Sequence, residues 1–212
     1  MSKYSPAEEK LNIISHGIGC LLSIVALILL VLRASACGGE GHIVSAGVFG
    51  VSLILLYTAS TLYHNAKEPV MRYRLKIFDH AAIYVLIAGT YTPFAIITLS
   101  GTVGWVLLFV SWALALIGIT LKLFFTGRYN TVSTIMYVLM GWIIIFAINP
   151  LMDSLSQEGL HWLFAGGVSY TLGAVIFSIP KIKFNHAIFH LFVLVGSFCH
   201  FWSVYFYVLP SN

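Results

Sequence analysis

The sequence predicts an all-α integral membrane protein, a bundle of seven transmembrane helices that forms a single domain over residues 1–212. Three observations support this prediction. Hydrophobic residues make up 59% of the chain and charged residues only 8%, whereas a soluble domain carries about 25% charged residues. The mean hydropathy is +0.95. The few charges also gather in clusters, and the long uncharged stretches between them are the predicted spans.

Each helix is predicted from an uncharged stretch, because a helix needs about 20 apolar residues to cross the bilayer. The stretch 80–121 is long enough for two helices, with Ser100-Gly101-Thr102 as the turn between them. The other stretches, which hold one helix each, run over 11–32, 41–66, 129–152, 159–180 and 184–212. The predicted helices therefore lie, in chain order, near 11–32, 42–65, 78–99, 103–125, 131–150, 160–180 and 185–208.

The basic residues predict the orientation of the bundle. With seven spans, one side of the membrane receives the N-terminus and the loops near 66–77, 126–130 and 181–184. That side holds ten basic residues, namely Lys3, Lys10, Lys67, Arg72, Arg74, Lys76, Lys122, Arg128, Lys181 and Lys183. The other side holds only Arg33, with Glu40, Asp153 and Glu158. Because basic residues favour the cytoplasmic side, we expect a cytoplasmic N-terminus and a C-terminus outside.

The net charge of +4 is then explained by topology and by contact with anionic lipids. Nucleic-acid binding is not expected, because no basic stripe interleaves with exposed aromatic residues. Short tails without an organelle signal favour a multi-pass protein of a bacterial inner (plasma) membrane. We expect membrane lipids as partners, with a lipid as a possible substrate, while the sequence leaves the oligomeric state open.

Four ionisable residues lie inside the predicted spans near the cytoplasmic side: His64, Asp79, His186 and His190. Ionisable groups in apolar spans are costly and mark functional sites. His186 and His190 share one helix face because they lie four residues apart. Together with His64, they predict a metal site of three imidazoles.

Depth in the membrane supports this grouping. His64, Asp79 and His186 each lie three residues from a lysine that marks the interface. Their side chains are therefore expected at one depth, roughly 4–5 Å inside the membrane. Ser60 and His190 each lie one further turn in. Three helices thus bring polar groups to one layer.

Three imidazoles with an open fourth position suit Zn²⁺ at a catalytic site. A water bound there has its pKa lowered toward about 7, and Asp79 could take its proton as a general base. Ser60, one turn from His64, could orient that imidazole or donate a hydrogen bond to a developing oxyanion.

Each of these residues also has a purely structural interpretation. A lone intramembrane histidine is often a hydrogen-bonded packing residue, Asp79 could cap the start of the third helix, and Ser60 could bond back to its own helix. His16 could reach the same layer from the first helix. His200 is too deep for the same metal but could line a polar cavity that leads toward it. The convergence of three helices favours the metal site.

These residues also occur in motifs of a known family. They are Ser60-Thr61-Leu62-Tyr63-His64, Phe78-Asp79-His80 and His186-Ala187-Ile188-Phe189-His190, together with Asn12…His16-Gly17 and Tyr91-Thr92-Pro93-Phe94. On them, and over nearly its whole length, the sequence resembles the hemolysin III proteins, the bacterial branch of the progestin and adiponectin receptor superfamily. The resemblance implies seven helices, zinc held by His64, His186 and His190, Asp79 binding or activating the zinc water, and Ser60 beside it.

Three functions follow as hypotheses. Relatives with ceramidase-like activity, and alkaline ceramidases, make a zinc-dependent hydrolase of lipid amides the first. The family name implies lysis of red cells, so a cytolysin or pore is the second. The third is a membrane sensor or homeostasis protein in which zinc is structural and joins the second and seventh helices. The residues predict the site but leave the substrate, and whether there is one, open.

Overall fold

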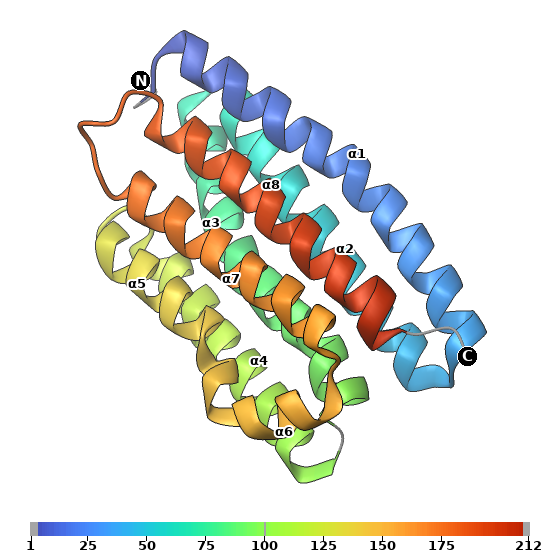
Figure 1. Ribbon diagram of the computed structural model, residues 1–212. Coiled ribbons are helices and arrows are strands. Elements are labelled where there is room, and N and C mark those ends of the chain that lie inside the picture. Colours follow the sequence, from blue (N-terminus) through green and yellow to red (C-terminus); the bar gives the residue numbers. More distant parts are fainter. Residues whose placement is uncertain (1–3, 100, 210–212) are drawn as a thin grey trace.

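The computed structural model describes residues 4–99 and 101–209, so Lys3 and Ser100 of the predictions above lie outside the described residues. The chain folds into helices packed side by side (Figure 1). They are α1 (Pro6–Cys37), α2 (Glu40–Asn65), α3 (Pro69–Pro93), α4 (Gly101–Phe125), α5 (Asn130–Gly141), α6 (Ile148–Ser154), α7 (Gln157–Phe177) and α8 (Asn185–Ser203). Three short segments join or extend them: η1 (Phe94–Thr98), η2 (Ile143–Ala147) and η3 (Val204–Val208).

Seven helical segments among the described residues are long and apolar enough to cross a membrane, which confirms the predicted fold class. Six of them are built on one long helix each. The fifth, Thr131–Ser154, combines α5, the 3-10 segment η2 and α6. The π-helical segments η1 and η3 continue α3 and α8 at the end of the bundle away from the N-terminus.

The third helix starts earlier than the apolar pattern predicts, at Pro69 rather than near 78. Glu68 caps it: one carboxylate oxygen accepts the amide of Val70 at 3.0 Å and the other accepts the amide of Met71 at 2.6 Å. These amides hold the pKa of Glu68 below its ordinary value, because they favour the charged carboxylate. The first turns of α3 are therefore a charged helix that hydropathy alone does not detect.

The first helix likewise begins at Pro6 rather than near 11. The Ser5 hydroxyl accepts the amide of Glu8 at 3.2 Å, and proline at the first position needs no amide partner. This early start carries Glu8 and Glu9 into the first turn of α1.

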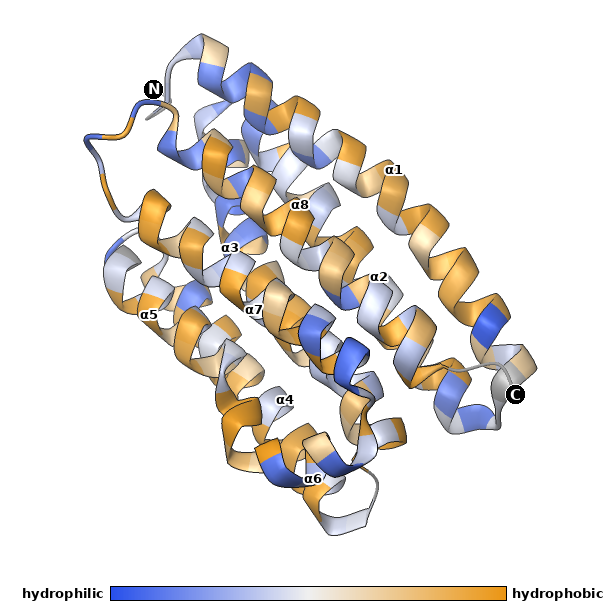
Figure 2. Ribbon diagram, viewed as in Figure 1, coloured by the Kyte–Doolittle hydropathy of each residue, from blue (hydrophilic) through white to orange (hydrophobic). Residues whose placement is uncertain are grey.

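The centre of the bundle is formed by α2 and α3. More than half of the most apolar window of each is buried, against 22% for α1 and 17% for the fifth span. Helix α1 packs on α2 and α8, α3 on α2 and α4, and α7 on α8. The outward surfaces of α1, α4 and the fifth span are hydrophobic along most of their length (Figure 2), as lipid contact requires.

The N-terminus lies at the same end of the bundle as the connection 178–184 between α7 and α8 (Figure 1). The connections 66–68 and 126–129 return to that end as well, since the spans alternate in direction. We call it the basic end, because it holds every described basic residue except Arg33. The histidine cluster lies at this end, and two of its members, His186 and His190, line the main cavity.

Candidate metal centre

Three imidazoles meet at the basic end. His64 lies in the last turn of α2, and His186 and His190 lie in the first turns of α8. The Nε2 atom of His186 is 3.1 Å from Nε2 of His64 and 3.1 Å from Nε2 of His190. All three side chains are buried. The predicted grouping of these histidines is therefore present in the fold.

The spacing of the three nitrogens fits a metal ion. Each histidine offers one ring nitrogen, and these atoms lie within 4.8 Å of one another. Zinc binds imidazole nitrogen at about 2.0–2.1 Å in tetrahedral geometry, which places neighbouring ligand nitrogens about 3.3 Å apart. Three Nε2 atoms that converge in a buried pocket could therefore hold one divalent cation.

Residues of α1 contact Nδ1 of His64, on the side of the ring that faces away from the cluster. Its Nδ1 lies 2.6 Å from Oε2 of Glu9, and the amide nitrogen of Asn12 is 3.4 Å from the same Nδ1. A carboxylate accepts but cannot donate, so the Nδ1–H of His64 donates to Glu9 and the Nε2 lone pair points into the cluster. This carboxylate–histidine arrangement is typical of metal-binding imidazoles.

The same helix orients the other two histidines. The Ser15 hydroxyl lies 3.3 Å from Nδ1 of His190. Oε1 of Glu8 accepts the backbone amide of His186 at 3.2 Å, one of the amides that the start of α8 leaves without a partner in its own helix. The start of α1 therefore touches all three histidines.

Tyr4 covers the cluster from outside the spans. Its ring stacks on His186 with centroids 4.5 Å apart and an interplanar angle of 15°. Burial raises the pKa of Tyr4 above its ordinary value, and the neighbouring Tyr63 and Asp79 raise it further. Tyr4 is therefore a neutral phenol, which suits a group stacked on an imidazole.

Asp79 and Ser60 complete the layer. Asp79 is 7% exposed and interacts electrostatically with His64, and Ser60 lies beside its carboxyl group. The Ser60 hydroxyl is buried, and among residues 4–99 and 101–209 it has the Asp79 carboxyl group as a polar neighbour. Ser60 is thus placed to donate to a group that enters the site, and the interpretation of Ser60 as bonded to its own helix is not what the structure shows.

The structural interpretation of Asp79 as a helix cap is wrong. The cap of α3 is Glu68, and Asp79 lies well inside the helix, where it faces α2. The error has a physical reason. The apolar stretch does not include the charged first turns of α3, so hydropathy predicts that the helix starts near Asp79.

His16 lies beside the cluster, whereas His200 lines a cavity that is mainly apolar rather than polar as predicted. His16 stacks on His190, with centroids 3.5 Å apart and an angle of 9°. His200 lines the same cavity as His186 and His190, and its Nε2 lies 3.1 Å from the carbonyl oxygen of Leu163. His16 therefore supports the cluster directly, while His200 belongs to the far end of the cavity.

Four residues at the cluster were not predicted from the sequence: Tyr4, Glu8, Glu9 and Ser15. The available signal was the acidic pair itself, since the chain has only seven acidic residues and two are adjacent at the start of the first helix. The sequence does not predict which helices contact α1, because hydropathy does not show that α1 packs on both α2 and α8.

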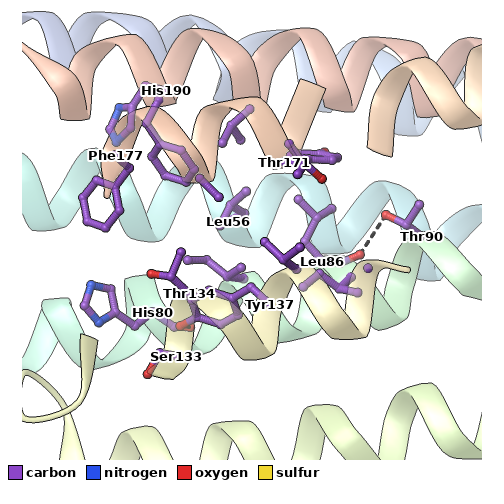
Figure 3. A pocket seen from close by; sticks show the side chains of 18 of the residues that line it. Leu56, His80, Leu86, Thr90, Ser133, Thr134, Tyr137, Thr171, Phe177 and His190 are labelled. Carbon is purple, nitrogen blue, oxygen red and sulfur yellow. Dashed lines mark hydrogen bonds between the residues drawn. The ribbon is translucent and has the colours of Figure 1, made fainter. Parts of the chain in front are cut away.

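An apolar cavity of about 230 Å³ extends from this layer into the bundle. Ser60, Asp79, His186 and His190 line its wall near the metal centre (Figure 3 labels His190 with Phe177 and Leu56). Residues deeper in the bundle line the rest, among them Leu86, Phe94, Ile144, Leu163 and Val193. Asp79 and Phe94 lie about 22 Å apart along α3 at 1.5 Å per residue, so the cavity is elongated along the helices.

Comparisons with known proteins agree with these features. The sequence model of the family described as "Haemolysin-III related" matches residues 4–201. "Hemolysin-3" of Bacillus cereus is 52% identical over 204 residues, which cover 96% of this chain and 93% of that protein. "Hemolysin-3 homolog" of Bacillus subtilis (strain 168) is 50% identical over 200 residues, covering 94% of each.

A more distant relative is "Monocyte to macrophage differentiation factor" of Homo sapiens, 27% identical over 217 residues that cover 99% of this chain and 89% of that protein. The family match agrees with the motifs that carry the resemblance and with the seven apolar spans. The chain is a multi-pass membrane protein that belongs to the haemolysin-III-related family.

Proposed function

We propose that this protein is a zinc-dependent hydrolase of lipid amides. One observation carries the proposal: two imidazoles of the metal-competent cluster, His186 and His190, line one elongated apolar cavity together with the Asp79 carboxyl group and the Ser60 hydroxyl. Polar chemistry at one end of an apolar tunnel suits an amphipathic substrate whose acyl chain fills the tunnel.

The side chains at the site would have distinct roles in the reaction. His64, His186 and His190 hold the metal, and Glu9 and Ser15 fix two of the rings. Bound zinc supplies a Lewis acid that polarises a carbonyl group and makes a neighbouring water more acidic. Asp79 would accept the proton of the attacking water and pass it to the amide nitrogen as the C–N bond breaks, and the Ser60 hydroxyl would donate to the amide oxygen as negative charge develops there.

The first test is the metal content of the detergent-purified protein, measured by mass spectrometry beside the His186→Ala/His190→Ala double variant. We expect about one zinc per chain, lost in the variant. A folded wild-type protein without any bound metal would overturn the proposal.

The second test is turnover of lipid amides by the zinc-loaded protein. We expect Asp79→Ala to bind zinc but to lose on the order of 10²–10⁴-fold in rate, which is what a general base contributes. Asp153→Ala, which removes an exposed carboxyl group remote from the cavity, is the matched control and should keep full activity. An Asp79→Ala variant as active as wild type would exclude the proposed role of Asp79.

A structural role for the metal is the second candidate, and one observation favours it. The cluster and the residues around it join α1, α2 and α8 through His64, His186 and Glu9. A chelator that lowers the melting temperature, in a protein that never turns over any lipid amide, would support this candidate against the hydrolase.

A further inference from the structure

Lys122 is a buried cation at the basic end, in the last turn of α4. It is only 3% exposed, so its ammonium group does not reach the membrane surface. Its Nζ donates to the Ser133 hydroxyl and lies 5.9 Å from the centre of the Tyr137 ring. No carboxylate pairs with it among residues 4–99 and 101–209. Burial of a charged group without a counter-ion costs free energy. The surroundings of Lys122 therefore favour the binding of an anion.

His80 stands opposite Lys122 on α3. Its Nδ1 is buried and has no hydrogen-bond partner among the described residues, while its backbone carbonyl accepts the Tyr137 hydroxyl at 3.0 Å. His80 follows Asp79 directly but points about 100° away around the helix. The ring therefore faces away from the metal centre and toward α4 and α5.

Lys76, one turn before His80, brings a second ammonium group to the same place. It lines the cavity with His80 and Lys122. Its Nζ also lies close to Gly127 in the connection 126–129, 3.4 Å from the position that a Cβ atom on this glycine would take. Lys76 and Lys122 repel each other and both repel a positive charge on His80. Lys76 also attracts the Asp79 carboxyl group one turn away, and an anion that enters beside Lys122 would be attracted by both ammonium groups.

These groups line one side of the cavity at the basic end. Figure 3 shows His80, Ser133, Thr134 and Tyr137 on one side of the pocket and Phe177 and His190 on the other. The Ser133 hydroxyl donates to the backbone carbonyl of Tyr129 at 2.9 Å and accepts from the Lys122 ammonium group, which it holds at this wall. The wall continues without a break into the apolar part of the cavity.

We propose that Lys76, His80 and Lys122, here called the cationic subsite, bind the anionic head group of a single-chain amphipath whose chain lies in the cavity. The head group is a phosphate monoester or a carboxylate, which accept hydrogen bonds from ammonium and imidazole donors. The inference rests on the proposed function and narrows its substrate class: a lipid amide that carries an anionic group close to its amide bond.

The test is binding without turnover, measured by isothermal titration calorimetry in a neutral detergent. The probes are dodecyl phosphate, dodecyl glucoside as the neutral head group with the same chain, and inorganic phosphate alone. We expect dodecyl phosphate to bind at least tenfold more tightly than either of the others. Equal binding of dodecyl phosphate and dodecyl glucoside would overturn the subsite, and equal binding of inorganic phosphate would overturn the amphipath.

Variants locate the anion. Lys122→Gln should weaken dodecyl phosphate binding at least tenfold, Lys122→Arg should retain it, and Lys67→Gln, which removes an exposed lysine at the same end, should leave it unchanged. Size-exclusion profiles show whether each variant is folded. If Lys122→Gln disturbs the fold, His80→Ala provides the same test, with the same loss expected.

The metal centre is a competing place for an anion, and one variant separates the two. The His186→Ala/His190→Ala protein lacks the metal ligands but keeps the cationic subsite. Binding retained in this variant supports the subsite even if no hydrolysis is ever found. Binding lost there but kept in Lys122→Gln would place the anion on the metal and overturn the inference.

Discussion

Glu9 is the residue on which the shape of the metal centre depends most. Its carboxylate spans two partners, with Oε2 at Nδ1 of His64 and Oε1 paired to Arg72. The first contact fixes which nitrogen of His64 carries the proton, and the second holds the carboxylate in place. Glu9 therefore sets both the orientation and the basicity of His64, a candidate metal ligand.

Replacement of Glu9 should weaken metal binding while leaving the ligands present. For Glu9→Gln we expect zinc affinity to fall about 10–100-fold, as is usual when the partner of a metal-binding histidine is removed. Competition against a calibrated chelator measures this in detergent. Arg72→Gln removes the ion pair but leaves the contact to His64, so it should cost much less. Equal losses in both variants would show that the ion pair, not the histidine contact, is what matters.

At the scale of single residues, the sequence predicts the candidate metal ligands better than the residues that contact them. His64, Asp79 and His186 could be placed in one layer because each lies near a lysine that marks the membrane interface. Glu8 and Glu9 reach His186 and His64 across 178 and 55 residues of chain. No periodicity reports contacts of that range, so the partners of the histidines could not be predicted.

The helices themselves follow closely from hydropathy, but their starts do not. The spans near 42–65 and 103–125 match α2 and α4 within a few residues. The starts of α1 and α3 were missed because Ser5 and Glu68 cap charged turns outside the apolar stretches. The same error produced the wrong interpretation of Asp79, so a boundary error became an error about a site residue.

The contact between α4 and the π-helical segment η1 gives a prediction for helix packing. A Cβ on Gly104 would overlap the backbone carbonyl oxygen of Ala95, which cannot rotate away. Gly104→Ala should therefore destabilise the protein by about 1–3 kcal/mol through overpacking, measured as a lower melting temperature in detergent.

Gly47 on α2 is the matched control. Nothing lies within 4 Å of a Cβ at this position, and alanine is the better helix former by up to about 1 kcal/mol. Gly47→Ala should keep or raise the melting temperature. Equal melting temperatures for the two variants would contradict the close approach of α4 and η1.

The whole molecule presents an apolar surface over most of its length. Large side chains such as Leu21, Phe124 and Phe146 are more than half exposed, as suits lipid contact. A secreted cytolysin must first remain soluble in water, and such a surface opposes this. The described surface therefore favours a resident membrane protein over a secreted cytolysin.

The expected orientation, with the basic end in the cytoplasm, is tested on the whole molecule. In a background where Cys20, Cys37 and Cys199 are replaced by alanine, single cysteines are introduced as Arg128→Cys and Gln157→Cys, at exposed positions on opposite ends. A membrane-impermeant maleimide should label only the Gln157→Cys protein in intact cells, and both after lysis. The reverse pattern would mean that the bundle is inverted.

The separation of the cluster's residues along the chain has a consequence for biogenesis. Glu9 enters the membrane with the first span, but His186 and His190 follow only with the last, and His64 meets His186 across 122 residues. A ribosome must therefore have translated nearly the whole chain before the site exists. Any metal can be acquired only by the completed bundle, so metal occupancy would report directly on successful assembly, and a chain stalled before its final helix would stay unloaded.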